Sequence, residues 1–349
     1  MFVEIIYLGD KENRVFACLI FMECASHACI AEAWLQHPKK VLNLTLLCIL
    51  GPTAVGKTEI AIKIALRIGG EIVSVDSRQI YRQMDIGTAK PTPEQLKLVP
   101  HHVINSVSPD EYFSVADYQK IADEAINQIH QRGKVPMLVG GSGMYFRAVV
   151  DGLFDGPDTD KVLRKRLRQE AEEHGIEYLY EKLKIIDPKA ADNIHHNDLI
   201  RIIRALEVFE LSGERISDLQ QQWNSSEPRY QFVAFGLDYP RQELYKRIEA
   251  RVNQMMSDGL LDEVRSLSGY SRELPSMNCL GYKELLAYLD SKCDLDEAVR
   301  LIKQNTRRFA KRQLTWFRKD KRIKWIDLST CPFPEDIIIE GFNNTNLEC

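Results

Sequence analysis

The sequence lacks the cysteine spacing that marks a metal-binding finger or a disulfide framework. Its eight cysteines are scattered, and no two of them form a CxxC pair. Cys18, Cys24 and Cys29 lie near His27, but their spacing is uneven and the stretch is apolar. We interpret them as core residues rather than metal ligands. The pattern favours reduced thiols, as in a cytoplasmic protein.

A long uninterrupted apolar run is also absent. The apolar stretch from Val15 to Trp34 is interrupted by Glu23, His27 and Glu32. A membrane helix needs roughly 20 consecutive apolar residues, and no clear positively charged segment leads to a cleavage site here. We therefore expect no membrane association, and we interpret residues 1–43 as an N-terminal extension without a role in the chemistry.

The chain has no overall excess of positive charge that would indicate a nucleic-acid-binding protein. Its formal net charge is -4 and its isoelectric point lies near 6.1. Any nucleic-acid site must therefore come from local clustering of basic residues. Internal repeats and low-complexity tracts are absent as well. With 349 residues and 44% hydrophobic content, the chain can form a main body and a smaller unit.

A complete phosphate-loop pattern follows the first strand signal. Leu44 to Leu50 is a short apolar run typical of a buried parallel strand, and it leads into GPTAVGKT, which matches GxxxxGK[ST]. Glu59 to Ile68 is predicted as a helix that ends at Gly69 and Gly70. Strand, loop and helix thus occur in the order that the motif requires. The residues predicted to surround a phosphate are Gly51, Pro52, Thr53, Ala54, Val55, Gly56, Lys57 and Thr58.

The chemistry of this loop follows from its backbone. Glycines let successive N–H groups turn inward on a phosphate at the positive end of a helix. Lys57 then neutralises phosphate oxygens, and Thr58 is placed to hold Mg2+. A glycine-rich turn without a ligand would not explain a lysine and a threonine directly after Gly56. The loop does not reveal which group the phosphates carry.

Two further strand signals end in candidate site residues. Glu71 to Val75 is followed by Asp76, and Val135 to Val139 is followed by GGSGMY around Ser142. Residues at the carboxyl ends of strands in an open parallel sheet face the ligand crevice. Asp76 is therefore a candidate base, although a helix-cap or turn role explains its position equally well. These elements predict an α/β fold, a P-loop NTPase-like parallel sheet flanked by helices.

After Gly156 the strand signals give way to amphipathic helices. We predict a helical insertion domain over residues 158–228, a catalytic core over 44–157 and 229–327, and a tail over 328–349. The strands predicted late in the core are Phe232 to Leu237 and Ile323 to Ile326. The predicted helices are Val115 to Arg132, Lys161 to His174, Glu177 to Ile186, Leu199 to Leu211, Arg241 to Met256, Leu260 to Leu267 and Leu295 to Phe317.

A basic segment covers residues 300–324. It contains 11 Lys or Arg residues and one acid, Asp320, which gives a local charge of 11 − 1 = +10. Such a cluster is the expected footprint of a phosphate backbone. Phe309, Trp316 and Phe317 are interleaved with the charges and can pack inward or stack on bases. A solvated basic helix is the alternative interpretation, but a neighbouring P-loop and helical insertion favour nucleic acid.

Seven segments in order resemble the bacterial-type tRNA dimethylallyltransferases, also called tRNA isopentenyltransferases. One such segment would be a weak signal, whereas seven in order are highly specific. The resemblance runs from Leu47 to about Asp327. The segments are GPTAVGKT (Gly51 to Thr58), VDSRQIYRQMDIGTAKP (Val75 to Pro91), PHH (Pro100 to His102), PMLVGGSGMY (Pro136 to Tyr145), RIIRALEV (Arg201 to Val208), GYKE (Gly281 to Glu284) and TRRFAKRQLTWFR (Thr306 to Arg318).

The resemblance implies that the P-loop holds the diphosphate of dimethylallyl diphosphate. The prenyl group would pass to N6 of the adenosine 3′-adjacent to the anticodon in tRNA, and ATP would not be a substrate. The implied reaction is direct displacement at an allylic carbon. Lys57, Arg251, the loop amides and Mg2+ at Thr58 would stabilise the departing diphosphate, while Asp76 would accept the N6 proton. Ser142 belongs to the same catalytic set.

The resemblance also implies that the helical insertion domain contacts tRNA, and it implies a set of contact residues that carry over by position. For three of these contact residues a structural role is the alternative. Tyr282 could be a core residue, and Arg201 and Arg204 could pair with Glu207 on one helix face. We expect the protein to act as a monomer, with dimethylallyl diphosphate and the anticodon stem-loop of tRNA as its partners. The implied contacts are Asp76, Ser77, Arg78, Gln79, Ser142, Arg164, Ile200, Arg201, Ile202, Ile203, Arg204, Asn278, Cys279, Leu280, Gly281, Tyr282, Lys283, Lys311, Arg312, Gln313, Leu314, Thr315, Trp316, Phe317 and Arg318.

The sequence departs from the family pattern at three places. Ser142 stands where the family more usually has threonine, which keeps the hydroxyl. Leu199 and Ile200 replace a more polar pair. The zinc finger of eukaryotic relatives is absent, and Cys331 with Cys349 cannot replace it.

Three other functions share part of this pattern. A small-molecule P-loop kinase would use Lys57, Thr58 and Asp76, but it would need ATP and has no use for the basic segment. An enzyme that prenylates free AMP or ADP has no use for that segment either. A non-enzymatic RNA-binding protein leaves the P-loop unexplained.

Overall fold

The computed structural model describes residues 42–221 and 227–347. The N-terminal extension expected over residues 1–43, with Cys18, Cys24 and Cys29, therefore lies almost wholly outside the described residues. No helix within the described ranges is both long enough and apolar enough to cross a membrane.

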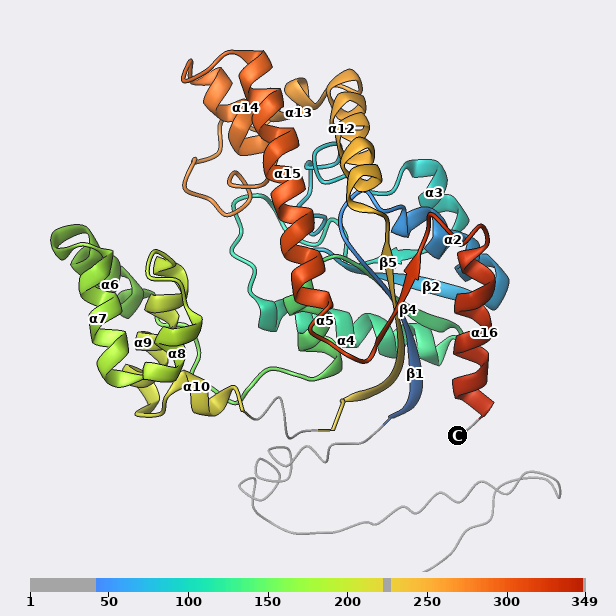
Figure 1. Cartoon of the computed structure of the whole chain (residues 1–349), viewed down its shortest axis with the longest axis horizontal. Coiled ribbons are helices and arrows are strands. Elements are labelled where there is room, and N and C mark those ends of the chain that lie inside the picture. Colours follow the sequence, from blue (N-terminus) through green and yellow to red (C-terminus); the bar gives the residue numbers. More distant parts are fainter. Residues whose placement is uncertain (1–41, 222–226, 348–349) are drawn as a thin grey trace, which may run out of the picture. The chain divides into compact units, whose positions relative to one another are not determined.

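The described residues form an α/β fold around a six-stranded parallel sheet (Figure 1), as predicted. The strand order is β3-β2-β4-β1-β5-β6, and every neighbouring pair is parallel. The two-residue strand β3 was not predicted, because it is too short to give a periodic signal. The strands are β1 Leu42–Leu50, β2 Gly70–Val75, β3 His101–His102, β4 Val135–Gly140, β5 Tyr230–Asp238 and β6 Ile323–Asp327.

The eight predicted helices begin and end within two residues of the predicted positions. The short helices α3, α5 and α14 were not predicted, because few turns give a weak periodic signal. The helices outside the predicted insertion are α2 Lys57–Ile68, α3 Pro93–Leu98, α4 Val115–Gln131, α5 Gly143–Val150, α12 Arg241–Ser257, α13 Leu260–Ser266, α14 Tyr282–Leu289, α15 Leu295–Phe317 and α16 Pro334–Leu347.

Strand β1 is buried on both faces of the sheet. Leu46, Cys48 and Leu50 belong to a hydrophobic core shared with α4 and α5. Leu47 and Ile49, which point the other way, belong to a core shared with α2 and α16. Successive strand side chains alternate between faces, so a strand covered on both sides needs apolar residues at every position. This explains the continuous apolar run in the sequence.

Within the predicted insertion, the described residues 158–221 carry five helices, coloured green to yellow in Figure 1, that pack on one another. Leu167, Leu183, Ile202 and Leu206 belong to a hydrophobic cluster that these helices build among themselves. The helices are α6 Lys161–His174, α7 Ile176–Ile186, α8 Pro188–Asn193, α9 Leu199–Ser212 and α10 Ile216–Leu219.

A buried carboxylate joins α6 to α9. Glu207 is fully buried and accepts hydrogen bonds from Arg164 (2.8 Å to each carboxylate oxygen), from Arg204 Nη1 (2.7 Å) and from the N–H of Asp160 (2.9 Å). Two cations and a backbone N–H thus replace the water that the carboxylate loses on burial.

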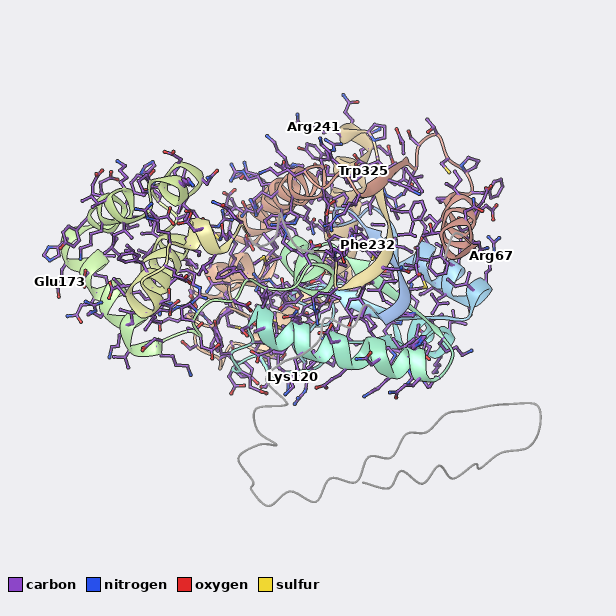
Figure 2. The ribbon with its side chains drawn as sticks, turned by 90° about the horizontal axis from the view of Figure 1, so that it is seen from below. Arg67, Lys120, Glu173, Phe232, Arg241 and Trp325 are labelled. Carbon is purple, nitrogen blue, oxygen red and sulfur yellow. The ribbon has the colours of Figure 1, made fainter. Side chains whose placement is uncertain are left out.

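Residues 334–347, expected only as part of a tail, form the helix α16. Ile338 and Phe342 enter the core on the α2 side of the sheet, and Arg67 of α2 pairs with Asp336 at 2.5 Å where the two helices meet (Figure 2). The helix was missed because its three consecutive isoleucines, residues 337–339, do not show the spacing of three or four residues that marks an amphipathic helix.

Replacing Glu207 with alanine should destabilise the protein. The variant leaves two guanidinium groups and a backbone N–H without their partner, and removing one member of a buried ion pair costs about 3 to 5 kcal/mol. Urea unfolding followed by circular dichroism measures the change. Glu210→Ala, which removes only an exposed pair with Arg166, is the control and should cost under about 1 kcal/mol. Equal losses in both variants would contradict the structural role of Glu207.

Candidate active site

The P-loop connects β1 to α2 and folds back on the ammonium group of Lys57. The Nζ atom of Lys57 donates to the carbonyl oxygens of Gly51 (3.0 Å) and Pro52 (2.7 Å). At Gly51 the loop passes β5 so closely that a Cβ atom would lie 2.6 Å from the carbonyl oxygen of Leu237. Only glycine fits there, which explains the first glycine of the motif.

A cavity of about 470 Å³ opens above the carboxyl ends of the central strands. Lys57 and Thr58 of the P-loop, Asp76 after β2, Arg251 of α12 and Phe309 of α15 all line it. Four of the five residues predicted as catalytic therefore share one cavity. The carboxyl edge of a parallel sheet is where ligands bind in this class of fold.

The fifth, Ser142, lies beside this group at the start of α5. Its Oγ atom accepts a hydrogen bond from the N–H of Ser77 at 3.0 Å, next to Asp76. One carboxylate oxygen of Asp76 accepts from the N–H of Arg78 at 2.8 Å, which closes a tight turn. The sequence position of Asp76 was compatible with a role in a turn or in a ligand site. In the structure Asp76 both closes the turn and lines the cavity.

Positive charge is concentrated around the P-loop. Burial of the ammonium group, together with the positive charge of Arg251, lowers the pKa of Lys57 to about 7, against the opposing effect of Asp76. Burial also lowers the pKa of Arg251, and Asp76 opposes this. Arg251 Nη1 donates to Thr53 Oγ1 at 3.4 Å. A bound polyanion would relieve the repulsion between the two cations.

Arg247 is a cavity residue that the sequence interpretation missed. Its Nε atom donates to the carbonyl oxygen of Ala54 at 3.1 Å, and its guanidinium carbon lies 4.8 Å from the ring centroid of Tyr239. Arg247 precedes Arg251 by one helical turn. Residues four apart share a helix face, so this spacing was the available signal.

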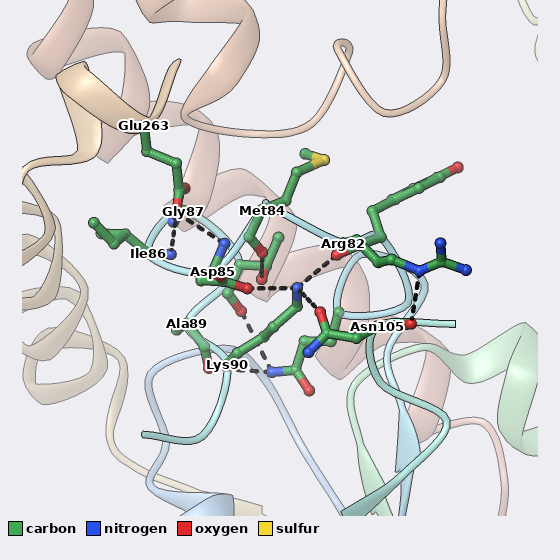
Figure 3. Close-up of polar contacts among 12 residues, drawn as sticks. Arg82, Met84, Asp85, Ile86, Gly87, Ala89, Lys90, Asn105 and Glu263 are labelled. Carbon is green, nitrogen blue, oxygen red and sulfur yellow. Dashed lines mark hydrogen bonds and ion pairs between the residues drawn. The ribbon is translucent and has the colours of Figure 1, made fainter. Parts of the chain in front are cut away.

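The loop that follows Asp76 is held by a buried lysine (Figure 3). Lys90 Nζ donates to the Tyr81 carbonyl oxygen (2.5 Å), to Asp85 Oδ1 (2.7 Å) and to Asn105 Oδ1 (2.5 Å). Burial lowers the pKa of Lys90, and the hydrogen bond to Asp85 partly offsets this decrease. The lysine fixes the loop from inside and is not available to a ligand.

Glu263 of α13 holds the same loop from outside (Figure 3). Its carboxylate accepts from the N–H groups of Asp85 and Ile86 (2.8 Å each) and of Gly87 (3.0 Å), and from the hydroxyl of Tyr282 (2.5 Å). A Cβ atom on Gly87 would lie 2.4 Å from the Tyr282 ring. The structure therefore places Tyr282 in the core, the alternative left open for it. The two anchors fix one wall of the cavity, where Thr88 and Ala89 lie.

The predicted tRNA contacts differ widely in exposure. Arg164 and Arg204 are partly buried and bond to Glu207, and Arg201 pairs with Asp198 at 3.2 Å. Those with buried positions are Ile202, Ile203, Cys279, Gly281, Tyr282, Gln313 and Phe317. Those with exposed positions are Ile200, Arg201, Asn278, Lys283, Lys311, Arg312, Thr315, Trp316 and Arg318. The exposed set is available to tRNA, and its role remains a prediction.

The basic segment is partly neutralised by acids elsewhere in the fold. Arg300 pairs with Glu297, Arg307 with Glu249, Arg318 with Asp238, and Arg322 with Asp151 and Asp320, each at 2.6 Å. Within the described part of the chain, the remaining basic residues of the segment form no ion pair. These are Lys303, Arg308, Lys311, Arg312, Lys319, Lys321 and Lys324.

Comparison with known protein families assigns the chain to one of them. A family model described as IPP transferase matches residues 79–320, well over half of the sequence. The chain belongs to the IPP transferase family. The match begins after the P-loop, so the phosphate-binding motif supports the family assignment independently.

Other members of the family are similar along most of their length. A tRNA dimethylallyltransferase of Geobacter sulfurreducens is 47% identical over 284 residues, which are 81% of this chain and 91% of that protein. A tRNA dimethylallyltransferase of Carboxydothermus hydrogenoformans is 50% identical over 306 residues, which are 86% of this chain and 98% of that protein.

Solved structures of the family share the fold. The full-length tRNA isopentenylpyrophosphate transferase of Bacillus halodurans is 43% identical, with a TM-score of 0.64, over 87% of this chain and 97% of that one. A eukaryotic dimethylallyltransferase acting on tRNA is 26% identical, with a TM-score of 0.70, over 87% of this chain and 80% of that one.

The lowered pKa of Lys57 predicts that diphosphate binding takes up a proton. Above about pH 7 the free lysine is mostly neutral, and a bound anion favours its charged form. Affinity for inorganic pyrophosphate should therefore weaken as the pH rises above 7, by up to about tenfold per pH unit from this group.

Calorimetric titration in buffers of different ionisation enthalpy measures the protons taken up. Lys57→Arg keeps a permanent charge, so the difference between the wild type and this variant isolates the proton of Lys57. Equal uptake by both proteins would contradict the prediction.

Proposed function

We propose that this chain transfers the dimethylallyl group of dimethylallyl diphosphate to N6 of the adenosine 3′-adjacent to the anticodon in tRNA, releasing diphosphate. The observation that carries the proposal is one cavity lined by five residues of the phosphate loop, by two arginines and by Asp76 at a strand end. Relatives named tRNA dimethylallyltransferase, similar over most of the chain, support it.

The P-loop side of the cavity suits the leaving group. As the allylic C–O bond breaks, negative charge grows on the diphosphate oxygen that receives the electron pair. Lys57 and Arg251 line this side of the cavity, and the Arg251 guanidinium is already held by the Thr53 hydroxyl of the loop. Fixed donors and cations stabilise developing charge without reorganising at the moment of reaction.

The Asp76 side suits the acceptor. The N6 amine of adenine is a weak nucleophile, because its lone pair is delocalised into the ring. As its nitrogen bonds to the allylic carbon, Asp76 takes up one of its protons. The base must leave its stack to reach an enclosed cavity. Alignment of the amine with the allylic carbon then supplies much of the acceleration.

We also propose Mg2+ as a cofactor. The Thr58 hydroxyl lines the cavity, and such a hard oxygen ligand suits Mg2+ shared with phosphate oxygens. Among the described residues, no group of three or more His, Cys, Asp or Glu could hold a metal. This favours an ion that is held jointly with the diphosphate. When bound, the ion would neutralise part of the diphosphate charge.

The principal alternative, a small-molecule kinase, would use the P-loop for ATP. The unpaired basic residues of the segment 300–324 argue against it, because a metabolite kinase has no use for an extended positive surface. The monomeric state and the cytoplasmic location remain predictions.

Transfer of label from radiolabelled dimethylallyl diphosphate, in the absence of ATP, tests the function. We expect label in tRNA whose anticodon-adjacent base is adenosine, and none in the guanosine counterpart or in free AMP. Transfer to AMP would instead indicate a nucleotide prenyltransferase. Turnover of ATP without transfer would indicate a kinase.

Asp76→Asn should lower kcat by about 100-fold or more, because it removes the general base. Asparagine keeps an Oδ1 atom that can accept the Arg78 N–H, so the turn is preserved. Asp262→Asn, at an exposed aspartate outside the cavity, is the matched control and should match the wild type. Unchanged kcat in Asp76→Asn would remove Asp76 from the chemistry.

Lys311→Ala should weaken tRNA binding and reduce the slope of log affinity against log salt by about one, because one phosphate contact is lost. Arg300→Ala is the control, since Arg300 is already paired with Glu297 and should leave the slope unchanged. Filter binding at several salt concentrations measures both. If Lys311→Ala left the slope of log affinity against log salt unchanged, Lys311 would not contact a tRNA phosphate.

A further inference from the structure

Gln313 lies in the basic segment, but its side chain points inward. Its neighbours Lys311 and Arg312 are exposed, whereas Gln313 is 7% exposed and lines the cavity. Its Oε1 atom accepts the N–H of Thr53 at 2.9 Å, and its Nε2 atom donates to the carbonyl oxygen of Gly141 at 2.9 Å. Both ends of the amide are therefore engaged by backbone groups.

The two backbone groups belong to different halves of the cavity. Thr53 is part of the P-loop, which would hold the diphosphate. Gly141 follows β4, and the N–H groups of Gly141 and Ser142 both donate to the carbonyl oxygen of Val75 at 3.0 Å. Val75 directly precedes Asp76. A continuous set of hydrogen bonds thus runs from the P-loop through Gln313 to the strand end that carries Asp76.

The fit around Gln313 is close. A Cβ atom on Gly141 would lie 2.2 Å from Gln313 Nε2, so a side chain at that position would displace the amide of Gln313. One helical turn later Trp316 packs against the same loop, where a Cβ atom on Gly143 would lie 2.0 Å from the indole ring. Residues three apart share a helix face, so α15 contacts this loop at two successive places.

We propose that Gln313 is a positioning residue for the transfer reaction. It holds the P-loop at a fixed distance from the Gly141 loop, so that the leaving diphosphate and the amine beside Asp76 face each other. This inference rests on the proposed prenyl transfer. Because Gln313 sits on α15, whose outer face carries the exposed basic residues, the helix offered to tRNA is also the one that fixes the P-loop.

Gln313→Glu gives the sharpest test, because it keeps the shape of the side chain. A protonated carboxyl can donate to Gly141 and accept from Thr53, as the amide does. An ionised carboxylate still accepts from Thr53 but repels the Gly141 carbonyl oxygen. Burial raises the pKa of such a carboxyl, which brings its titration toward the pH range of the assay.

The expected result is a pH-dependent kcat ratio. At about pH 8, kcat of Gln313→Glu should be about 10- to 100-fold below the wild type, since small misplacements in a site cost this much. The deficit should shrink toward about pH 6 as the carboxyl gains its proton. Dividing by the wild-type profile removes the titration of the groups that the two proteins share.

Gln313→Met and Gln304→Glu complete the set. Methionine removes both hydrogen bonds, so kcat should stay low at every pH while KM for tRNA changes by less than about twofold. Gln304 lies on the same helix outside the cavity, and its variant should follow the wild-type profile. Thermal unfolding of each variant shows whether it folds, and Gln313→Glu retains the packing if Gln313→Met does not fold.

Two results would overturn the proposal. Unchanged kcat with a raised KM for tRNA would make Gln313 a tRNA contact instead. A kcat ratio for Gln313→Glu that does not change with pH would show that the pair of hydrogen bonds does not position the loops. Failure of the proposed function is distinguishable, because the wild type would then transfer no label to tRNA at all.

Discussion

The whole site depends on the close approach of backbones at the carboxyl edge of the sheet. Gly51 passes the Leu237 carbonyl of β5, and a Cβ atom on Gly140 would lie 2.1 Å from the carbonyl oxygen of Val75 in β2. These contacts leave no room for side chains, so the loops after β1 and β4 begin at almost fixed positions. The cavity exists where it does because three neighbouring strands end together.

The same geometry determines which charged side chains line the cavity. The fold places Arg251 close enough to Lys57 to disfavour the charge of the lysine before any ligand binds, and burial disfavours the charge of both groups. Without a ligand, this arrangement costs stability, which is the usual condition of a site that must stabilise an anion. Asp76 tempers the repulsion in the free protein and, in the proposed reaction, becomes the proton acceptor. The Asp76 carboxylate thus has a role both in the free protein and in the proposed reaction.

The sequence predicted the sheet and the P-loop well, because continuous apolar runs and a fixed glycine pattern are local signals. It failed where the cause lies in distant residues. The inward direction of Gln313 depends on the packing of α15 against two loops far away in the chain. Likewise, Tyr282 is held by Glu263, a partner that periodicity does not reveal. The pair of Arg204 with Glu207, three residues apart on one helix, was instead an alternative that the sequence itself offered. Arg247 was also missed, but in its case a local signal was available, because it lies one helical turn before Arg251.

The helices of residues 161–219 build a hydrophobic cluster and a buried ion cluster from their own side chains. Their outer surface can therefore change during evolution without altering the catalytic strands. Selection for different RNA partners and selection for the same bond-forming step can then act on separate parts of one gene.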